Sequence, residues 1–253
     1  MASVCGRSST KISAKDVLLG ELLGRQRLAP QAVNSLIARV LAHDALVACG
    51  IRSCIRCGEV LGKNLETTGC CEVCARSRGT PEYLIALGGY NTGLGVLLSA
   101  AKYGRWPEVL GALGARLGDA TLARLGARGV APIIVPMPAP MLRRWHRGIN
   151  HSGELATAVA RVTGWESASL LQRRWEATQV GASASQRDRG ARRLAPAWRA
   201  AKRLIGRSVV LVDDVRTSGT SLARASRCCR RLGATHVVAA VVAVRREDVA
   251  KSP

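Results

Sequence analysis

An acidic pair stands between a strongly apolar run and a turn of small residues in the last quarter of this 253-residue chain. The apolar run, 209–212, contains only valine and leucine, which predicts a buried strand. Asp213 and Asp214 follow it, and a helix is expected over 222–232. The turn before that helix is built from small hydroxyl residues and one glycine: Thr217, Ser218, Gly219, Thr220 and Ser221.

This strand–turn–helix arrangement suits a phosphorylated sugar. Backbone N–H groups and the positive end of the helix dipole attract a phosphate at the start of a helix. The two carboxylates can accept hydrogen bonds from ribose hydroxyls or approach Mg²⁺. An ordinary strand–turn–helix with a capping Ser or Thr is the alternative, but the complete pattern over 208–222 favours the phosphate site.

The same segment resembles the phosphoribosyl pyrophosphate (PRPP) binding motif of type I phosphoribosyltransferases. That motif runs from four apolar residues through two acidic ones to a Thr-Thr-Gly-x-Thr loop, and Ser218 keeps the hydroxyl of the second threonine. The resemblance implies that Asp213 and Asp214 are the catalytic residues, which bind the ribose hydroxyls directly or through Mg²⁺. It also implies that 217–221 hold a phosphate of PRPP, and that pyrophosphate leaves from the anomeric carbon.

Two C-x-x-C pairs, separated by thirteen residues, indicate a metal site. The chain has nine cysteines and no export signal, which favours metal ligands or buried thiols over disulfides. The ligands expected for a structural, tetrahedral Zn²⁺ are Cys54, Cys57, Cys71 and Cys74. Cys70 could replace Cys71. A redox-active pair is the competing interpretation, and the presence of two pairs without a flanking βαβ pattern disfavours it.

With the cysteine pairs in front and the phosphoribosyl motif behind, the chain resembles the ComF family over roughly residues 50–245. That family joins an N-terminal zinc module to a phosphoribosyltransferase-type domain and includes bacterial competence proteins. The matching segments are Tyr90 with 101–104, then 134–138, then 147–151, and finally Gln179, Arg187 and Arg189. Gly190 stands where the family has asparagine, in the hood segment that should select the acceptor.

The resemblance adds residues to the PRPP site. In type I phosphoribosyltransferases the turn after an apolar strand holds pyrophosphate, and here that turn contains Pro136 and Met137. Arg147 could add charge-assisted hydrogen bonds to the pyrophosphate oxygens, as could its neighbours Arg143 and Arg144. Further candidates from the matched segments are Lys102, Asn150, Gln179 and Arg187.

No dedicated general base stands out. His146 and His151 are candidates by position, although a surface or hydrogen-bonding histidine is the favoured interpretation of both. Trp145 and Trp175 each follow an arginine pair and could stack on single-stranded bases. A tryptophan that anchors a loop against the core is the favoured interpretation there.

Strands and helices alternate in the segments that must position these residues. Strands are expected at 133–135, 209–212 and 237–244, helices at 14–49, 94–101, 109–125, 152–163 and 221–232, and an arginine-rich loop at 173–203. The alternation predicts a parallel sheet with helices on both faces. The expected fold class is therefore α/β: a type I phosphoribosyltransferase-like parallel sheet with flanking helices, preceded by a helical segment and a small zinc-ribbon-like module. The expected boundaries are 1–49 for the tail and helical segment, 50–80 for the four-cysteine zinc module and 81–253 for the phosphoribosyltransferase-like domain.

The net charge of +21 is concentrated, with nearly half of it in 131–207. Such a region attracts a polyanion, either PRPP or a nucleic acid, although a solvated basic face in an arginine-rich chain is the alternative. The first functional hypothesis is a Mg²⁺-dependent phosphoribosyltransferase with an unknown acceptor. The second is a non-catalytic competence protein for DNA uptake that binds PRPP and single-stranded DNA, with a competence helicase or other competence proteins as partners. A PRPP-sensing regulator without chemistry is the third.

No apolar run approaches the ~20 residues that a membrane-spanning helix needs. The N-terminal residues lack the apolar stretch of a signal peptide. We therefore expect a cytoplasmic protein without a membrane span.

Overall fold

The computed structural model describes residues 30–47, 53–59, 61, 69–77, 79–91, 93–103, 106–126, 131–138, 150–174, 193–198 and 200–245. The strands in these ranges are β1 (Leu84–Gly89), β2 (Ile133–Pro136), β3 (Leu171–Arg174), β4 (Arg193–Pro196), β5 (Ser208–Arg216) and β6 (His236–Val244). The helices are α2 (Pro30–Val47), α3 (Glu72–Arg76), α4 (Gly93–Tyr103), α5 (Pro107–Leu125), α7 (His151–Thr163), α9 (Ala200–Leu204) and α10 (Thr220–Arg231).

The central sheet has four parallel strands in the order β1-β6-β5-β2. Its two middle strands, β5 and β6, are the most strongly apolar runs of the chain, as expected for strands that are buried on both faces. The predicted α/β class with a parallel sheet is confirmed. The edge strand β1 was not predicted, because Gly88 and Gly89 weaken its strand signal.

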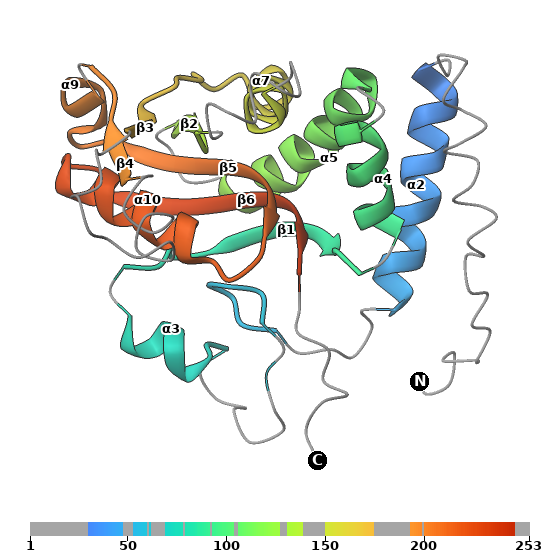
Figure 1. Ribbon diagram of the computed structural model, residues 1–253, viewed down its shortest axis with the longest axis horizontal. Coiled ribbons are helices and arrows are strands. Elements are labelled where there is room, and N and C mark those ends of the chain that lie inside the picture. Colours follow the sequence, from blue (N-terminus) through green and yellow to red (C-terminus); the bar gives the residue numbers. More distant parts are fainter. Residues whose placement is uncertain are drawn as a thin grey trace, which may run out of the picture.

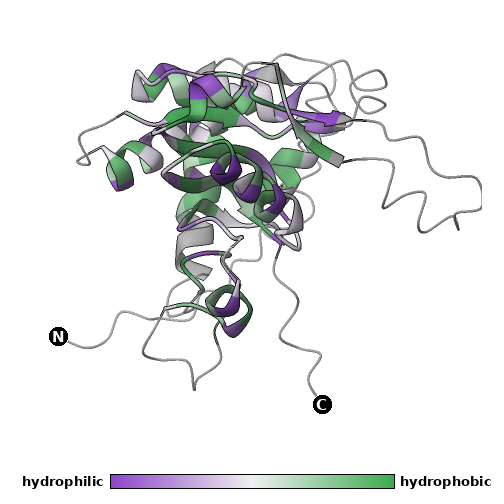
Figure 2. Cartoon of the chain, turned by 90° about the vertical axis from the view of Figure 1, so that its left-hand side faces the viewer, coloured by the Kyte–Doolittle hydropathy of each residue, from purple (hydrophilic) through white to green (hydrophobic). Residues whose placement is uncertain are grey.

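Side chains alternate between the two faces of the sheet. Val210 and Val212 of β5 belong to a cluster with α2, α4, α5 and α7, whereas Val209 and Leu211 belong to a second cluster with α9 and α10. Figure 1 shows α10 on one side of the sheet and the group of α4, α5 and α7 on the other. Hydrophobic residues gather in the sheet and in the inner parts of its helices (Figure 2).

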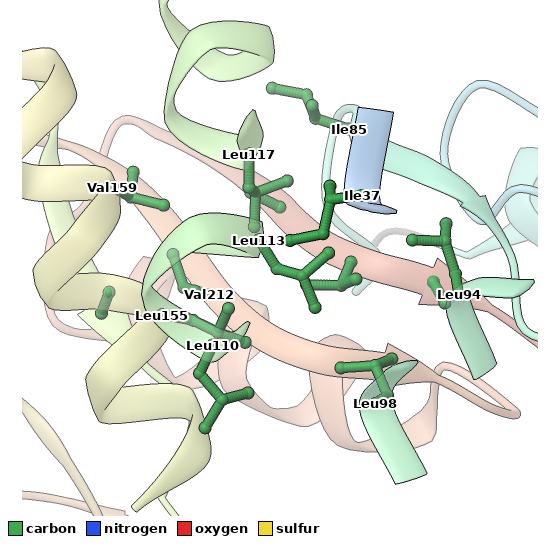
Figure 3. Packing of buried hydrophobic residues seen from close by; sticks show 14 of the residues in the cluster. Ile37, Ile85, Leu94, Leu98, Leu110, Leu113, Leu117, Leu155, Val159 and Val212 are labelled. Atoms are coloured by element: carbon green, nitrogen blue, oxygen red, sulfur yellow. The ribbon is translucent and has the colours of Figure 1, made fainter. Parts of the chain in front are cut away.

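Helix α5 forms the centre of the first cluster. Its fully buried leucines, Leu110, Leu113 and Leu117, recur at helical spacing and meet Leu155 of α7 and Ile37 of α2 (Figure 3). The helix begins with Pro107, which needs no intrahelical N–H partner at that position. The predicted helices over 94–101, 109–125 and 152–163 are therefore confirmed with small changes at their ends, and α2 lies within the predicted span 14–49.

The arginine-rich segment is more ordered at its ends than a loop would be. Gln172 and Arg173 of β3 pair antiparallel with Ala195 and Leu194 of β4, so a two-stranded ribbon frames this segment. The prediction of a loop over 173–203 is wrong at β3, at β4 and at α9. Pairing between β3 and β4 forms the ribbon although the segment is low in β-branched residues. Residues 175–192 lie outside the described ranges.

The helices that follow β2 and β5 lie on opposite faces of the sheet. Helix α7 follows β2 and packs in the first cluster, whereas α10 follows β5 and packs in the second. Open α/β sheets bind ligands outside the carboxyl ends of strands at such a switch point. In the described part of the chain, no helix is both long enough and apolar enough to cross a membrane.

The contact between α5 and α7 depends on glycine. A Cβ atom at Gly114 would lie 2.5 Å from the Cβ atom of Ala158 and 3.1 Å from the carbonyl oxygen of Leu155. We expect Gly114→Ala to lower the free energy of unfolding by about 1–3 kcal/mol, because this overpacking outweighs the better helix propensity of alanine. The measurement is urea denaturation followed by circular dichroism.

Gly111 in the same helix is the matched control, since a Cβ atom there would meet nothing within 4 Å. Gly111→Ala should raise the free energy of unfolding by up to about 1 kcal/mol. Equal stabilisation by the two substitutions would contradict the close approach of α5 and α7.

Candidate functional site

The carboxyl ends of β2 and β5 meet at one point. Pro136 lies opposite Val212, and the N–H of Met137 donates to the carbonyl oxygen of Val212 at 2.8 Å. Beyond Val212, β5 continues to Arg216 by pairing with β6 alone. The strand is therefore longer than the predicted 209–212. The acidic pair lies in the part of β5 that extends beyond the end of β2.

Both carboxylates contact side chains from helices of the first hydrophobic cluster. The Lys102 Nζ of α4 lies 2.6 Å from Asp214 Oδ2, and both side chains are largely buried. Asp213 Oδ1 accepts hydrogen bonds from the Ser152 hydroxyl of α7 at 2.9 Å and from the N–H of Asp214 at 3.0 Å. Ser152 was not predicted, because a serine near the start of a helix is usually a cap.

The environment changes the acidity of one member of the pair. Burial, followed by repulsion from Asp214, raises the pKa of Asp213 to about 7, although the Ser152 hydroxyl, the Asp214 N–H and Lys102 act in the opposite direction. A perturbed carboxyl in a cleft is typical of functional sites. Near neutral pH, Asp213 can thus lose its proton when a hydroxyl donor or a cation binds to the carboxylate in its place.

A cleft of about 300 Å³ opens beside the acidic pair. Its lining comes from the carboxyl ends of all four parallel strands, from α4 and α7, from β3, and from the start of α10 with the turn before it: Tyr90, Lys102, Met137, Pro138, His151, Ser152, Arg173, Asp213, Asp214, Val215, Arg216, Thr217, Gly219, Ser221, Leu222 and Arg245. Four of these side chains are cationic. The cleft thus contains more cationic side chains than the two carboxylates need for neutrality. Such an excess of positive charge suits a ligand that carries several negative charges.

Three of these cationic side chains come from positions that were not predicted to belong to the site, and one of them contacts Tyr90 of the matched segments. The Nε–H of Arg173 donates to the carbonyl oxygen of Pro138 at 2.9 Å, which places β3 next to the turn after β2. The Arg245 guanidinium lies over the Tyr90 ring at 4.8 Å from its centroid. Arg216 is the third cation. The register of the sheet brings Arg216 and Arg245 to this place, because they lie at the ends of the neighbouring strands β5 and β6, next to the end of β1.

The small-residue turn leads directly into α10. Gly219 has φ 76°, a left-handed conformation that favours glycine, and the helix begins at Thr220. The Ser218 hydroxyl lies 3.0 Å from the Thr220 hydroxyl and 3.4 Å from the Thr220 nitrogen. Thr217, Gly219 and Ser221 line the cleft, whereas Ser218 and Thr220 face a second groove beside the cysteine segment.

The other predicted site residues are distributed as follows. Lys102 and Met137 line the cleft, and so does His151, whose side chain is buried. Pro136 ends β2 and does not line the cleft itself, although Met137 after it does. Asn150 caps α7, and its side-chain oxygen accepts from the N–H of Gly153 at 3.4 Å. Their ligand-binding roles stay predictions. Several residues named in the sequence analysis lie outside the described ranges: Arg143, Arg144, Trp145, His146, Arg147, Trp175, Gln179, Arg187 and Arg189.

The four predicted cysteine ligands converge. Their sulfur atoms all lie within 4.8 Å of one another, close to the ~3.8 Å that tetrahedral coordination with Zn–S bonds of about 2.3 Å requires. Cys70 lies beside the group, with its sulfur 4.0 Å from Cys54 Sγ. Gly58 and Gly69, with φ 75° and 60°, allow the tight turns after the first pair and before the second.

The chemistry of these thiols also fits a cation. Burial acts to raise the pKa of Cys54, but backbone N–H groups of Cys71, Arg56 and Cys57 outweigh it and lower that pKa to about 6. Burial raises the pKa of Cys57 to about 12, and burial also raises that of Cys74. One thiolate thus forms readily and its neighbours resist a second charge, a penalty that a bound divalent cation would remove. The cluster could hold zinc.

Comparisons with known proteins identify relatives by sequence. No protein-family model matches the chain. DNA utilization protein YhgH of Salmonella typhi is 31% identical over 172 residues, a match that covers 66% of this chain and 74% of the relative. The protein of the same name from Escherichia coli K12 is 31% identical over 174 residues, with the same shares covered.

Solved structures match more weakly. The allosteric regulatory enzyme of purine biosynthesis matches 51% of this chain and 26% of its own, with 21% identity and a TM-score of 0.33. Glutamine PRPP amidotransferase from B. subtilis, complexed with ADP and GMP, matches 52% and 27%, with 19% identity and the same TM-score of 0.33. Scores this low add nothing to the strand order described above.

The purified chain is expected to carry one zinc ion, held by the four converging thiols. Cys71→Ser should lower the zinc content to well below one ion per chain, because it removes a ligand from the buried cluster. Cys70→Ser is the matched control, and it should keep the full content. Elemental analysis by mass spectrometry checks both. Zinc loss in Cys70→Ser with retention in Cys71→Ser would show that Cys70, and not Cys71, is the fourth ligand. Absence of zinc from the unaltered chain would contradict the zinc site altogether.

Proposed function

Since this chain belongs to the ComF family, the family of its relatives named DNA utilization protein YhgH, we propose that it binds PRPP with Mg²⁺ and transfers the phosphoribosyl group to an acceptor, releasing pyrophosphate. One observation carries the proposal. The acidic pair, the turn at the start of α10 and four cationic side chains all line one cleft at the carboxyl edge of the sheet.

The turn supplies the phosphate site. Thr217, Gly219 and Ser221 line the cleft where α10 begins, so their backbone and hydroxyl groups can donate to phosphate oxygens. The helix dipole adds positive potential at the same place. The sharp left-handed bend at Gly219 brings the backbone close to the ligand without an intervening side chain.

The acidic pair supplies the ribose site. Asp213 and Asp214 can accept hydrogen bonds from two adjacent ribose hydroxyls once Lys102 releases Asp214. Their negative charge also favours the positive charge that develops on the sugar ring when the bond to pyrophosphate weakens. Lys102 thus serves as the counter-ion of the ligand-free pair, and its ammonium is within reach of an incoming pyrophosphate.

The basic residues stabilise the leaving group. Arg173 and Arg245 line the cleft together with the acidic pair and can neutralise charge on pyrophosphate oxygens as it accumulates. The carboxylate oxygens of Asp213 and Asp214 are ligands that Mg²⁺ prefers, and the ion, when bound, would supply further positive charge to the pyrophosphate.

The chain is expected to bind PRPP in the presence of Mg²⁺, as measured by isothermal titration calorimetry. Asp214→Asn should weaken that binding at least tenfold, because the amide cannot replace an acceptor carboxylate that carries charge; tenfold corresponds to about 1.4 kcal/mol. Asp119→Asn is the matched control, because Asp119 is an exposed residue of α5, and it should bind PRPP as the unaltered chain does. Unaltered binding by Asp214→Asn would contradict the placement of the ribose.

Transfer itself is read by pyrophosphate release in the presence of a panel of nucleobases and amines. PRPP binding without acceptor-dependent release of pyrophosphate would leave a PRPP-sensing or PRPP-binding protein in place of the transferase.

A second candidate function is the handling of single-stranded DNA during uptake, with PRPP bound but not consumed. The name of the relatives and the net charge of +21 favour it. In this role a competence helicase or another competence protein would be the partner. The two candidates share the PRPP site and differ in the second ligand.

If the chain binds single-stranded DNA, the affinity for a fluorescent oligonucleotide should fall steeply between ~50 mM and ~200 mM salt, because each phosphate contact releases a counterion. The slope of log K against log salt is expected at about −0.7 per contacted phosphate. Fluorescence anisotropy measures both quantities. An oligonucleotide that fails to bind even at the lower salt concentration would rule this function out.

A further inference from the structure

Arg216 joins the cysteine segment to the turn at 217–221, which is called the phosphate turn below. It is the last residue of β5, and its side chain is only 9% exposed. The Arg216 Nη1 donates to Glu59 Oε2 at 2.9 Å across 157 positions of sequence. A buried charge needs such a partner, because removal of one member leaves the other desolvated without compensation.

Glu59 is held by the same turn that carries the first cysteine pair. Its carbonyl oxygen accepts from the N–H of Cys54 at 2.8 Å, and the N–H of Gly58 donates to the Cys54 carbonyl at 2.7 Å. The turn lies directly on the sheet, since a Cβ atom at Gly58 would approach Leu84 and Val244 to 3.0 Å. Whatever fixes this turn therefore fixes the carboxylate of Glu59.

Arg56 connects the turn to the second cysteine pair. Its guanidinium donates to the carbonyl oxygens of Cys74, Ser77, Thr80 and Pro81. The two cysteine pairs are thus held together by one side chain at their base as well as by the convergence of their thiols. A metal ion in the cluster would lock both pairs, and with them Glu59.

The other end of Arg216 lies against the phosphate turn. A Cβ atom at Gly219 would be 3.3 Å from Arg216 Nε, so the guanidinium packs directly against the residue that bends the chain into α10. The Nε atom is buried and has no hydrogen-bond partner among the described residues. An unsatisfied buried donor is costly, and such exceptions occur where a ligand or strain supplies the reason.

We propose that Arg216 is a positioning residue through which the cysteine cluster holds the phosphate turn, so that zinc in the cluster and PRPP at the turn stabilise each other. The chain of contacts runs from Cys54 through Glu59 and Arg216 to Gly219. The ligand half of this coupling rests on the proposed function. By linkage, the factor by which zinc strengthens PRPP binding equals the factor by which PRPP strengthens zinc binding.

The first test reads the turn itself and needs no PRPP. Amide hydrogen exchange of the peptide spanning 215–222 is compared in the zinc-loaded chain before and after chelation. Exchange should become several-fold faster after chelation. Zinc-loaded Glu59→Gln should show the faster exchange already, because the charge that holds Arg216 is removed while the metal remains, and chelation should add little further change.

Glu82→Gln is the matched control. Glu82 also pairs with an arginine, since its Oε1 lies 3.7 Å from Arg230 Nη2. It lines neither the cleft nor the second groove beside the cysteine segment. This variant should exchange as the unaltered chain does. A turn that exchanges at the same rate with and without zinc, or a Glu59→Gln variant that behaves like Glu82→Gln, would overturn the proposal.

The second test measures the coupling with PRPP. In zinc-loaded Glu59→Gln the affinity for PRPP with Mg²⁺ should fall by about tenfold, within the usual range of coupling between two sites. Chelator competition in excess Mg²⁺ should show that PRPP slows zinc loss in the unaltered chain and not in Glu59→Gln. A purely structural ion pair would lower thermal stability without changing this linkage. If the unaltered chain does not bind PRPP, the proposed function fails while the exchange measurement still decides the role of Arg216.

Discussion

The parallel pairing of β5 with β2 on one side and β6 on the other is the constraint on which the rest of the molecule depends. It buries β5 on both faces, so four consecutive apolar residues must precede the acidic pair. Because β2 ends opposite Val212 while β6 continues, the chain opens on one side at Asp213 and stays bonded on the other. The cleft forms at this step, next to the point where α7 and α10 leave the sheet on opposite faces.

The charges around the cleft follow from that position. Two adjacent carboxylates in a partly buried place repel each other. Lys102 pairs with Asp214, and the Ser152 hydroxyl donates to Asp213, which reduces this repulsion. These partners come from α4 and α7, which the sheet holds in place through the first hydrophobic cluster. The site is therefore assembled from the ends of rigid elements, and a polyanion would complete its charge balance.

The cysteine segment depends on the sheet as much as on a metal. It contributes little to either hydrophobic cluster, yet Gly58 packs against β1 and β6, and Glu59 pairs with Arg216 at the end of β5. A segment this small cannot bury enough apolar surface to fold alone. It lies beside the turn at 217–221, with which it lines one groove.

The sequence by itself determined the local chemistry. The apolar run, the acidic pair and the turn at 217–221 predicted a strand, a phosphate-binding turn and a helix, and the spacing of four cysteines predicted their convergence, because each of these signals lies within a few residues of chain. Only the tertiary structure decided that Arg173, Arg216 and Arg245 join the acidic pair and that Glu59 reaches Arg216. Those contacts depend on strand register and on packing between distant segments, and nothing in the local sequence distinguishes these arginines from the others among the thirty-two of the chain.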